Sequence, residues 1–147
     1  MKSLKTYLEK LQDVIPDQLV RVDEAVDWQY EITAIVDEVE REAGNPALLF
    51  ERIKGYSRPL LINLFGHVDR MILALEGGTL TRGSRLDFYR GWNSLITRKI
   101  PPTYVDNGPV KDVRRMGGEV DLASLPIPRF YEQDGGRYIT AGLLVAR

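Results

Sequence analysis

Proton transfer near neutral pH would fall most naturally to His67, the only histidine of the chain, because imidazole titrates in that range. His67 follows Gly66 where an apolar run typical of a strand changes to helical spacing, so a general base there is conceivable. No constellation of serine, cysteine and carboxylate side chains surrounds it in the sequence. We therefore interpret His67 as a structural or surface residue.

Metal binding is the second chemistry to consider, because a run of acidic residues extends from Asp37 to Glu42. On a helix, this run lies opposite the apolar residues Ile32, Ile35 and Val39. Carboxylates on the polar side of an amphipathic helix are usually solvated. We predict that these acids face solvent, and we assign no metal-binding residue in the chain.

Basic and aromatic residues are interleaved between Arg82 and Lys99, a composition that single-stranded nucleic-acid platforms use. The basic residues are Arg82, Arg85, Arg90, Arg98 and Lys99, and the aromatic ones are Phe88, Tyr89 and Trp92. The rings fall largely on a stripe with the spacing of a buried helix face: Leu86, Tyr89, Trp92, Leu95 and Ile96. The net charge of −1 adds no attraction to phosphate. We therefore predict no nucleic-acid partner.

The absence of cysteine excludes disulfides, thiolate metal sites and a cysteine nucleophile, and it fits a reducing compartment. The sequence contains no GxGxxG, GxxxxGK[ST], HExxH or GxSxG motif. No apolar run approaches the roughly 18 residues of a membrane span, and residues 1–12 form a charged amphipathic segment rather than a signal peptide. We predict a cytoplasmic protein without a membrane partner, and we assign no catalytic residue.

Helices and strands that alternate along the chain must position these residues. A first helix is predicted between the capping residue Ser3 and Pro16, and a second between Asp27, as its cap, and Gly44. The remaining helical patterns span 68–75 and 84–100. The strand patterns span 19–22, 47–50, 59–65 and 110–115. Turns are predicted at 23–24, 54–56, 76–78 and 117–118. The first strand is short and is expected near an edge of the sheet.

The final stretch, Leu122–Arg147, has a different character from the rest of the chain. It begins as a proline-stiffened connector, passes through an Asp-Gly-Gly turn at 134–136, and ends as an apolar strand at 138–145. Residues before about 115 can bury a core of their own, whereas this strand lacks neighbours. An unpaired strand edge attracts another strand. We predict weak self-association or a strand rearrangement through 138–145.

The ordered motifs of the chain resemble those of one known family. The segments DLASLPIPR at 121–129 and DGGRYITAG at 134–142 resemble the junction between the N-terminal and central domains of the UbiD-like decarboxylases. Earlier segments resemble the family in the same order: 19–23, 31–35, 46–50, 54–56, 59–66 and 109–113. The resemblance covers essentially the whole chain.

The resemblance and the patterns together predict an α+β fold. We expect a mixed small sheet with several amphipathic helices, followed by a connector and the first strand of an incomplete split β-barrel. The corresponding domains are an N-terminal α+β domain at 1–115, the connector at 116–133, and the first strand of a truncated flavin-binding domain at 134–147.

The resemblance implies a reversible decarboxylase of aromatic or α,β-unsaturated carboxylic acids. Such enzymes use prenylated flavin mononucleotide (prenylated FMN) with a divalent metal, usually Mn²⁺, and K⁺. The family's metal-binding asparagine, its catalytic arginine and glutamates, and the histidine and glutamate of its metal site all follow the strand that contains Arg147. The resemblance therefore places no catalytic or metal residue within this chain.

The same resemblance makes Thr140 and Gly142 the candidate cofactor-binding residues. The segment 139–142 resembles the first strand of the flavin-binding barrel, where Gly142 would allow a close approach of the backbone. The alternative is that Thr140 is only a β-branched strand residue.

Two functions follow as hypotheses. The first is the N-terminal portion of a UbiD-like decarboxylase that is inactive alone, binds no cofactor alone, and needs the remaining domains or a partner chain. The second is a stand-alone, non-catalytic assembly or interaction module that partners a catalytic chain.

Overall fold

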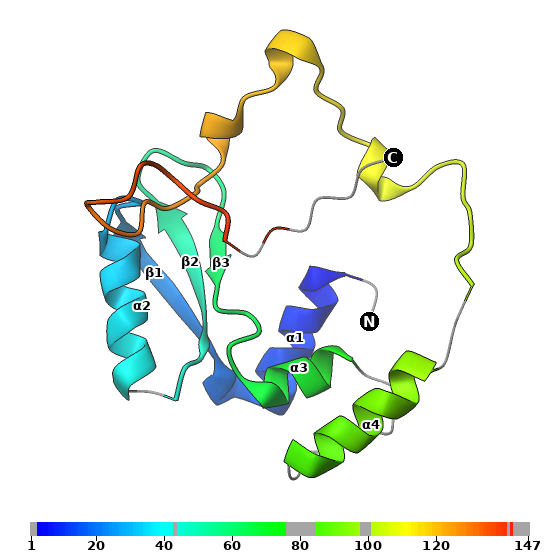
Figure 1. Ribbon diagram of the computed structural model, residues 1–147. Coiled ribbons are helices and arrows are strands. Elements are labelled where there is room, and N and C mark those ends of the chain that lie inside the picture. The colour runs from blue at the N-terminus through cyan, green and yellow to red at the C-terminus, as the bar shows by residue number, and fades with distance from the viewer. Residues whose placement is uncertain (1–2, 43, 76–84, 98–100, 141, 143–147) are drawn as a thin grey trace.

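A three-stranded mixed sheet is the centre of the fold. The computed structural model describes residues 3–42, 44–75, 85–97, 101–140 and 142. The strands β1 (Leu19–Val26), β2 (Ala47–Ile53) and β3 (Leu60–Ile62) lie in that order, with β1 parallel to β2 and β3 antiparallel to β2. Together with the helices, this sheet confirms the predicted α+β class (Figure 1).

Helix α1 (Leu4–Val14) begins where the sequence predicts it. Ser3 forms a capping box with Thr6, which satisfies two backbone N–H groups of the first turn. The apolar stripe of the helix then packs on one face of the sheet in a buried cluster of Tyr7, Leu11, Ile15, Leu19, Ala47 and Leu49. Because Tyr7, Leu8 and Leu11 recur at helical spacing, these side chains share the face that enters the core.

Helix α2 (Glu31–Glu42) connects β1 to β2 and covers the opposite face of the sheet. The prediction that Asp27 caps this helix is wrong: its carboxylate accepts the N–H of Gln29 at 2.8 Å, and Glu31 accepts the N–H of Asp27 at 2.6 Å. The helix begins later because Tyr30 adopts a left-handed φ of 68°. Gly44, with φ of 70°, follows the helix as expected.

The strands differ from the predicted ones in length. The acidic turn predicted at 23–24 is wrong, because β1 continues to Val26 with a bulge between Val22 and Ala25. Its predicted position at a sheet edge is confirmed. The hairpin between β2 and β3 is also confirmed, with Gly55 at a φ of 84°. Strand β3 is shorter than predicted because Asn63 leaves it with φ of 58°.

Helix α4 (Arg85–Thr97) does not bury its apolar stripe. Leu86, Tyr89 and Ile96 are each more than half exposed, so the prediction that this face enters the core is wrong. The core extends from α1 to α3 (Val68–Ala74), whereas α4 lies beside this body (Figure 1). The turn predicted at 76–78 lies outside the described residues.

The chain from 101 onward is mainly irregular. The strand predicted at 110–115 is wrong: the 3₁₀ helix η2 (Pro109–Lys111) and exposed loop residues replace it. The predicted turn at 117–118 is confirmed by η3 (Gly117–Glu119), and η4 (Leu122–Ser124) follows. Tyr138, Ile139 and Thr140 are not in a strand. Of the rest of the predicted strand, 141 and 143–145 lie outside the described residues.

Candidate functional site

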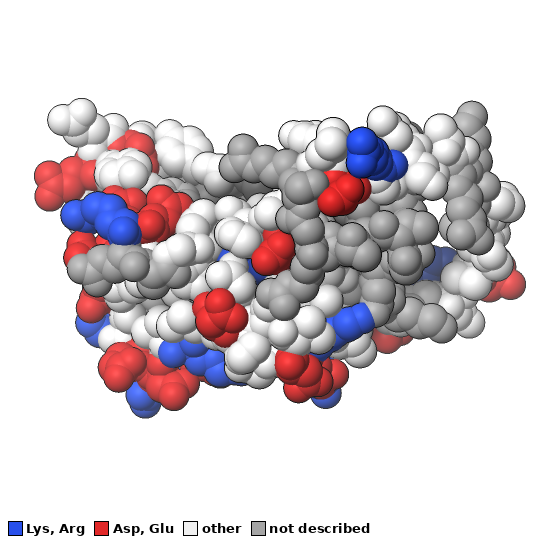
Figure 2. Space-filling view, turned by 90° about the horizontal axis from the view of Figure 1, so that it is seen from below, with Lys and Arg blue, Asp and Glu red and all other residues white. Residues whose placement is uncertain are grey.

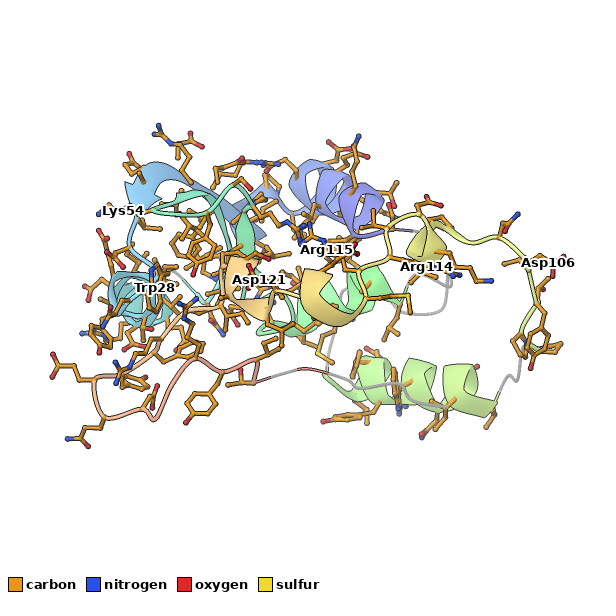
Figure 3. All side chains as sticks on the ribbon, turned by 90° about the horizontal axis from the view of Figure 1, so that it is seen from above. Trp28, Lys54, Asp106, Arg114, Arg115 and Asp121 are labelled. Carbon is orange, nitrogen blue, oxygen red and sulfur yellow. The ribbon has the colours of Figure 1, made fainter. Side chains whose placement is uncertain are left out.

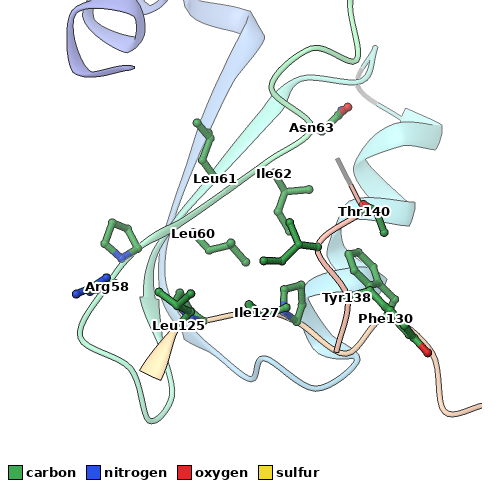
Figure 4. A pocket seen from close by; sticks show the side chains of 14 residues that line it. Arg58, Leu60, Leu61, Ile62, Asn63, Leu125, Ile127, Phe130, Tyr138 and Thr140 are labelled. Atoms are coloured by element: carbon green, nitrogen blue, oxygen red, sulfur yellow. The ribbon is translucent and has the colours of Figure 1, made fainter. Parts of the chain in front are cut away.

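An apolar groove of about 470 Å³ separates β3 from the C-terminal segment. One wall is residues 58–63, and the other consists of 125–128, Phe130 and 138–140. Figure 4 shows Leu60 and Ile62 directed into the space between these walls. The volume lies in the range of about 300–1,000 Å³ that small-molecule sites occupy.

The connector forms its wall because it is docked against the first part of the chain. Pro126 and Pro128 are buried. The backbone then pairs with the loop before α2: the N–H of Arg129 donates to the carbonyl of Trp28 at 3.1 Å, and the N–H of Tyr30 donates to the carbonyl of Arg129 at 3.1 Å. A proline cannot donate such a bond, so the first free backbone donor after Pro128 forms it.

The structure brings one of the two candidate cofactor residues to the groove. Thr140 is one of the residues that line the groove (Figure 4). Gly142 is not among the lining residues, and a Cβ at this glycine would lie 3.3 Å from Cγ2 of Ile139. The role of both residues in cofactor binding stays a prediction.

The described lining of the groove suits the binding of an apolar ligand. Its lining is mainly apolar, and the residues with polar side-chain groups are Arg58, Asn63, Tyr138 and Thr140. The side-chain amide of Asn63 already donates to the carbonyl of Pro46 at 3.0 Å and to the Asn45 side chain. The groove therefore combines a mainly apolar lining with the hydroxyl-bearing residues Tyr138 and Thr140, which suits a flat, mainly apolar ligand.

Two domain models of one family match the chain in sequence order. The 3-octaprenyl-4-hydroxybenzoate carboxy-lyase N-terminal domain matches residues 15–87, and the Rift-related domain of the same carboxy-lyase matches residues 103–147. Together these two matches span most of the chain. The chain belongs to the UbiD family.

Solved structures of UbiD-class enzymes agree with this assignment. Vanillic acid decarboxylase from Sedimentibacter hydroxybenzoicus, in its closed form, is 31% identical with a TM-score of 0.79 over 95% of this chain and 29% of its own. An evolved dimeric form of HmfF from Pelotomaculum thermopropionicum, in complex with prenylated FMN, is 31% identical with a TM-score of 0.72 over 96% of this chain and 31% of its own. The chain thus spans about a third of the length of these enzymes.

The other candidate residues of this UbiD-family chain are His67 and the acidic residues of α2. His67 caps α3, where its Nδ1 accepts the N–H of Asp69 at 3.3 Å, as its interpretation as a structural residue requires. Glu38 and Glu40 are exposed on α2, which confirms that these two acids face solvent. Among the described residues, no group of three or more histidine, aspartate or glutamate side chains could hold a metal ion.

Figure 2 shows acidic and basic side chains interspersed on the face that it presents. On α4, Arg90 lies 3.5 Å from Asp87, while Arg82, Arg98 and Lys99 lie outside the described residues. Within the described residues, no helix is both long and apolar enough to cross a membrane.

Sequence reasoning missed a buried arginine on α3, next to the turn that follows β3. Arg70 is fully buried, and its guanidinium donates to Leu64 O at 2.9 Å, Asn63 O at 2.9 Å and Gln18 Oε1 at 2.5 Å. The hydroxyl of Tyr7 donates to the carbonyl of Arg70 at 2.9 Å. Burial raises the pKa of Tyr7 and lowers the pKa of Arg70. The network fixes the turn that ends one wall of the groove.

Proposed function

We propose that this chain forms the N-terminal portion of a UbiD-class decarboxylase that acts on an aromatic or α,β-unsaturated carboxylic acid with prenylated FMN. The observation that carries the proposal is the match of two consecutive UbiD-family domain models, the second of which contains Thr140 at the groove. The UbiD-class relatives with FMN or prenylated FMN bound support the cofactor. We place the protein in the cytoplasm because it lacks cysteine.

The groove fits one part of the proposed cofactor. Its apolar lining and the hydroxyl of Thr140 suit the edge of a flavin ring, and bound prenylated FMN would supply the electron sink for loss of carbon dioxide. The described residues offer no carboxylate or imidazole cluster for the proposed Mn²⁺, and we assign them no K⁺ site. The part of this chain in the reaction is therefore to shape one wall of a site and to orient Thr140.

We predict that the chain alone does not catalyse decarboxylation. Prenylated FMN, Mn²⁺, K⁺ and a panel of aromatic and α,β-unsaturated acids should release no carbon dioxide above the protein-free blank, because the described lining of the groove contains no carboxyl or imidazole group to return a proton. A complete UbiD-class enzyme under the same conditions is the positive control. Turnover by the isolated chain would contradict its role as an incomplete portion.

The second candidate is a non-catalytic assembly module that partners a catalytic chain. It is favoured by the exposed apolar side chains Leu86, Tyr89 and Ile96 on α4, which are typical of a surface that another polypeptide covers. Co-purification with the remaining part of a UbiD-class enzyme, followed by recovered decarboxylation, would support the first function. A stable complex without recovered turnover would support the module.

We also propose that the chain self-associates weakly through 138–145. In the described part of this segment, Ile139 is 66% exposed and Tyr138 is 49% exposed, so a second copy could cover apolar area there. Sedimentation velocity over a concentration series should show a dimer that Ile139→Asp abolishes. Ile96→Asp on α4 is the matched control and should leave the dimer intact. Loss of the dimer in Ile96→Asp but not in Ile139→Asp would show that the interface lies on α4 instead.

A further inference from the structure

The side chain of Arg137 joins the C-terminal segment to two loops of the α+β body. Its guanidinium carbon lies 3.9 Å from the ring centroid of Trp28 and 6.0 Å from that of Tyr56, and Nη1 donates to the Tyr56 hydroxyl. A cation within about 6 Å of an aromatic face is attracted by it, and the planar guanidinium stacks well. One side chain therefore contacts both the β1–α2 loop and the β2–β3 hairpin.

The two loops that receive Arg137 lie at the same end of the molecule. Figure 3 shows Trp28, between β1 and α2, and Lys54, next to the hairpin turn, close together there. The ammonium of Lys54 lies 3.5 Å from the carboxylate of Glu31, which links the hairpin to the start of α2. Arg137 thus binds to a surface whose two parts are already connected.

The loop that carries Trp28 is itself held in an unusual conformation. Tyr30 has a φ of 68°, and such a conformation persists in a non-glycine residue only when its surroundings fix it. The backbone pairing with Arg129 is one such constraint, and the guanidinium carbon of Arg129 lies 5.6 Å from the centroid of the Tyr30 ring. The three residues 28–30 therefore contact the C-terminal segment at two places, Arg129 and Arg137.

The loop between these two contacts is closed by its own hydrogen bonds. Nη2 of Arg129 donates to the carbonyls of Glu132 at 2.9 Å and Asp134 at 2.8 Å. The carboxylate of Asp134 accepts the N–H of Tyr131 at 3.0 Å. Since both ends of this loop are bound to 28–30, the loop and the α+β body form one unit up to Arg137.

Thr140 follows Arg137 by three residues, which span at most about 10 Å of extended chain. We propose that Arg137 is a positioning residue: its contacts with Trp28 and Tyr56 determine where Thr140 lies in the groove. The geometry of these contacts carries the inference, and only the importance of Thr140 for a cofactor rests on the proposed function.

The first test measures the docking of the loop by hydrogen exchange. In Arg137→Ala, the amides of Tyr30 and Arg129 should exchange about five- to tenfold faster, because a lost cation–π contact and hydrogen bond favour local opening by that factor. Amides within β2 should keep their rates. Arg137→Lys should recover part of the protection, because it keeps the charge without the planar stack.

The second test measures the position of Thr140 without any cofactor. Because the chain has no cysteine, Thr140→Cys and Glu40→Cys can carry two nitroxide labels, one at the groove and one on the exposed side of α2. Pulsed electron resonance should give a narrow distance distribution in this double variant. Adding Arg137→Ala should broaden it, and adding Arg137→Lys should restore part of the narrow component.

Arg41→Ala is the matched control for both measurements, because Arg41 is exposed and its ion pair with Glu38 at 2.9 Å and its hydrogen bond to the carbonyl of Asp37 both lie within α2. It should change neither the exchange of Tyr30 nor the label distances. Unchanged exchange and an unchanged distribution in Arg137→Ala would overturn the proposal. Since neither measurement needs a flavin or turnover, failure of the proposed function would leave these results standing.

Discussion

Arg70→Ala is expected to lower the free energy of unfolding by about 3–5 kcal/mol, measured by urea denaturation of the chain. The substitution removes a fully buried side chain that donates to oxygens of Gln18, Asn63 and Leu64. Of these oxygens, the carbonyl of Asn63 keeps the N–H of Gly66 at 3.3 Å. The buried Oε1 of Gln18 then loses its compensation for leaving water, and a cavity remains where the guanidinium lay, next to the turn after β3.

Arg90→Ala is the matched control for this prediction. Arg90 is an exposed arginine on α4 whose ion pair with Asp87 is 3.5 Å long, so its loss should change stability by no more than about 0.5 kcal/mol. Arg70→Lys should fall between the two, because an ammonium cannot reach all three acceptors at once. A loss below about 1 kcal/mol for Arg70→Ala would show that the network does not hold the fold.

Gly66→Ala is expected to destabilise the chain by about 3 kcal/mol, because the turn between β3 and α3 has no room for a methyl group. A Cβ at this position would lie 1.9 Å from Oδ1 and 2.7 Å from Cγ of Asn63, and 2.9 Å from Nδ2 of Asn45. Asn63 would have to move, and its hydrogen bond to the carbonyl of Pro46 would be lost.

Gly118→Ala is the corresponding control, since a Cβ at Gly118 would meet nothing within 4 Å. Its change in stability should stay within about 0.5 kcal/mol. Because the clash at Gly66 involves the side chain of Asn63, the double variant Gly66→Ala and Asn63→Ala should lose less than the sum of the single losses. Strict additivity in thermal or urea unfolding would contradict the clash.

Patterns of neighbouring residues in the sequence predicted the caps and turns that those same residues form. The helix cap at Ser3, the helix end at Gly44 and the hairpin turn at 54–56 are set by neighbours in the sequence, and the structure has each of them. The buried face of α1 follows from helical spacing for the same reason. The ordered motifs at 121–129 and 134–142 indicated the UbiD family, and the two domain matches confirm it.

Contacts between residues far apart in the sequence, or their absence among the described residues, decided the features that were not predicted. Helical spacing in α4 marks an apolar face but does not say whether the described chain covers it, so Tyr89 and Ile96 are exposed. The segment 110–115 pairs with no strand of the described sheet, so it stays irregular. Arg70 has the sequence signature of a solvated helix residue, because its acceptors, among them Gln18, come from distant turns.

Only part of the groove wall could be predicted from the sequence. The proline connector and the motif with Thr140 were recognised, and the structure places both against β3. The contacts that hold them there, between Trp28 and Arg137 and between Gln29 and Arg129, join residues too far apart for any local pattern to report.

The bridge between Gln29 and Arg129 also bears on the order in which the chain folds. It closes a loop of 129 − 29 = 100 residues. Because the entropic cost of closing a loop grows with the logarithm of its length, closing this one costs about 4 kcal/mol of free energy. The β1–α2–β2 unit closes far shorter loops and can form first. The groove should therefore be among the last features to appear during refolding, after the sheet that supplies its other wall.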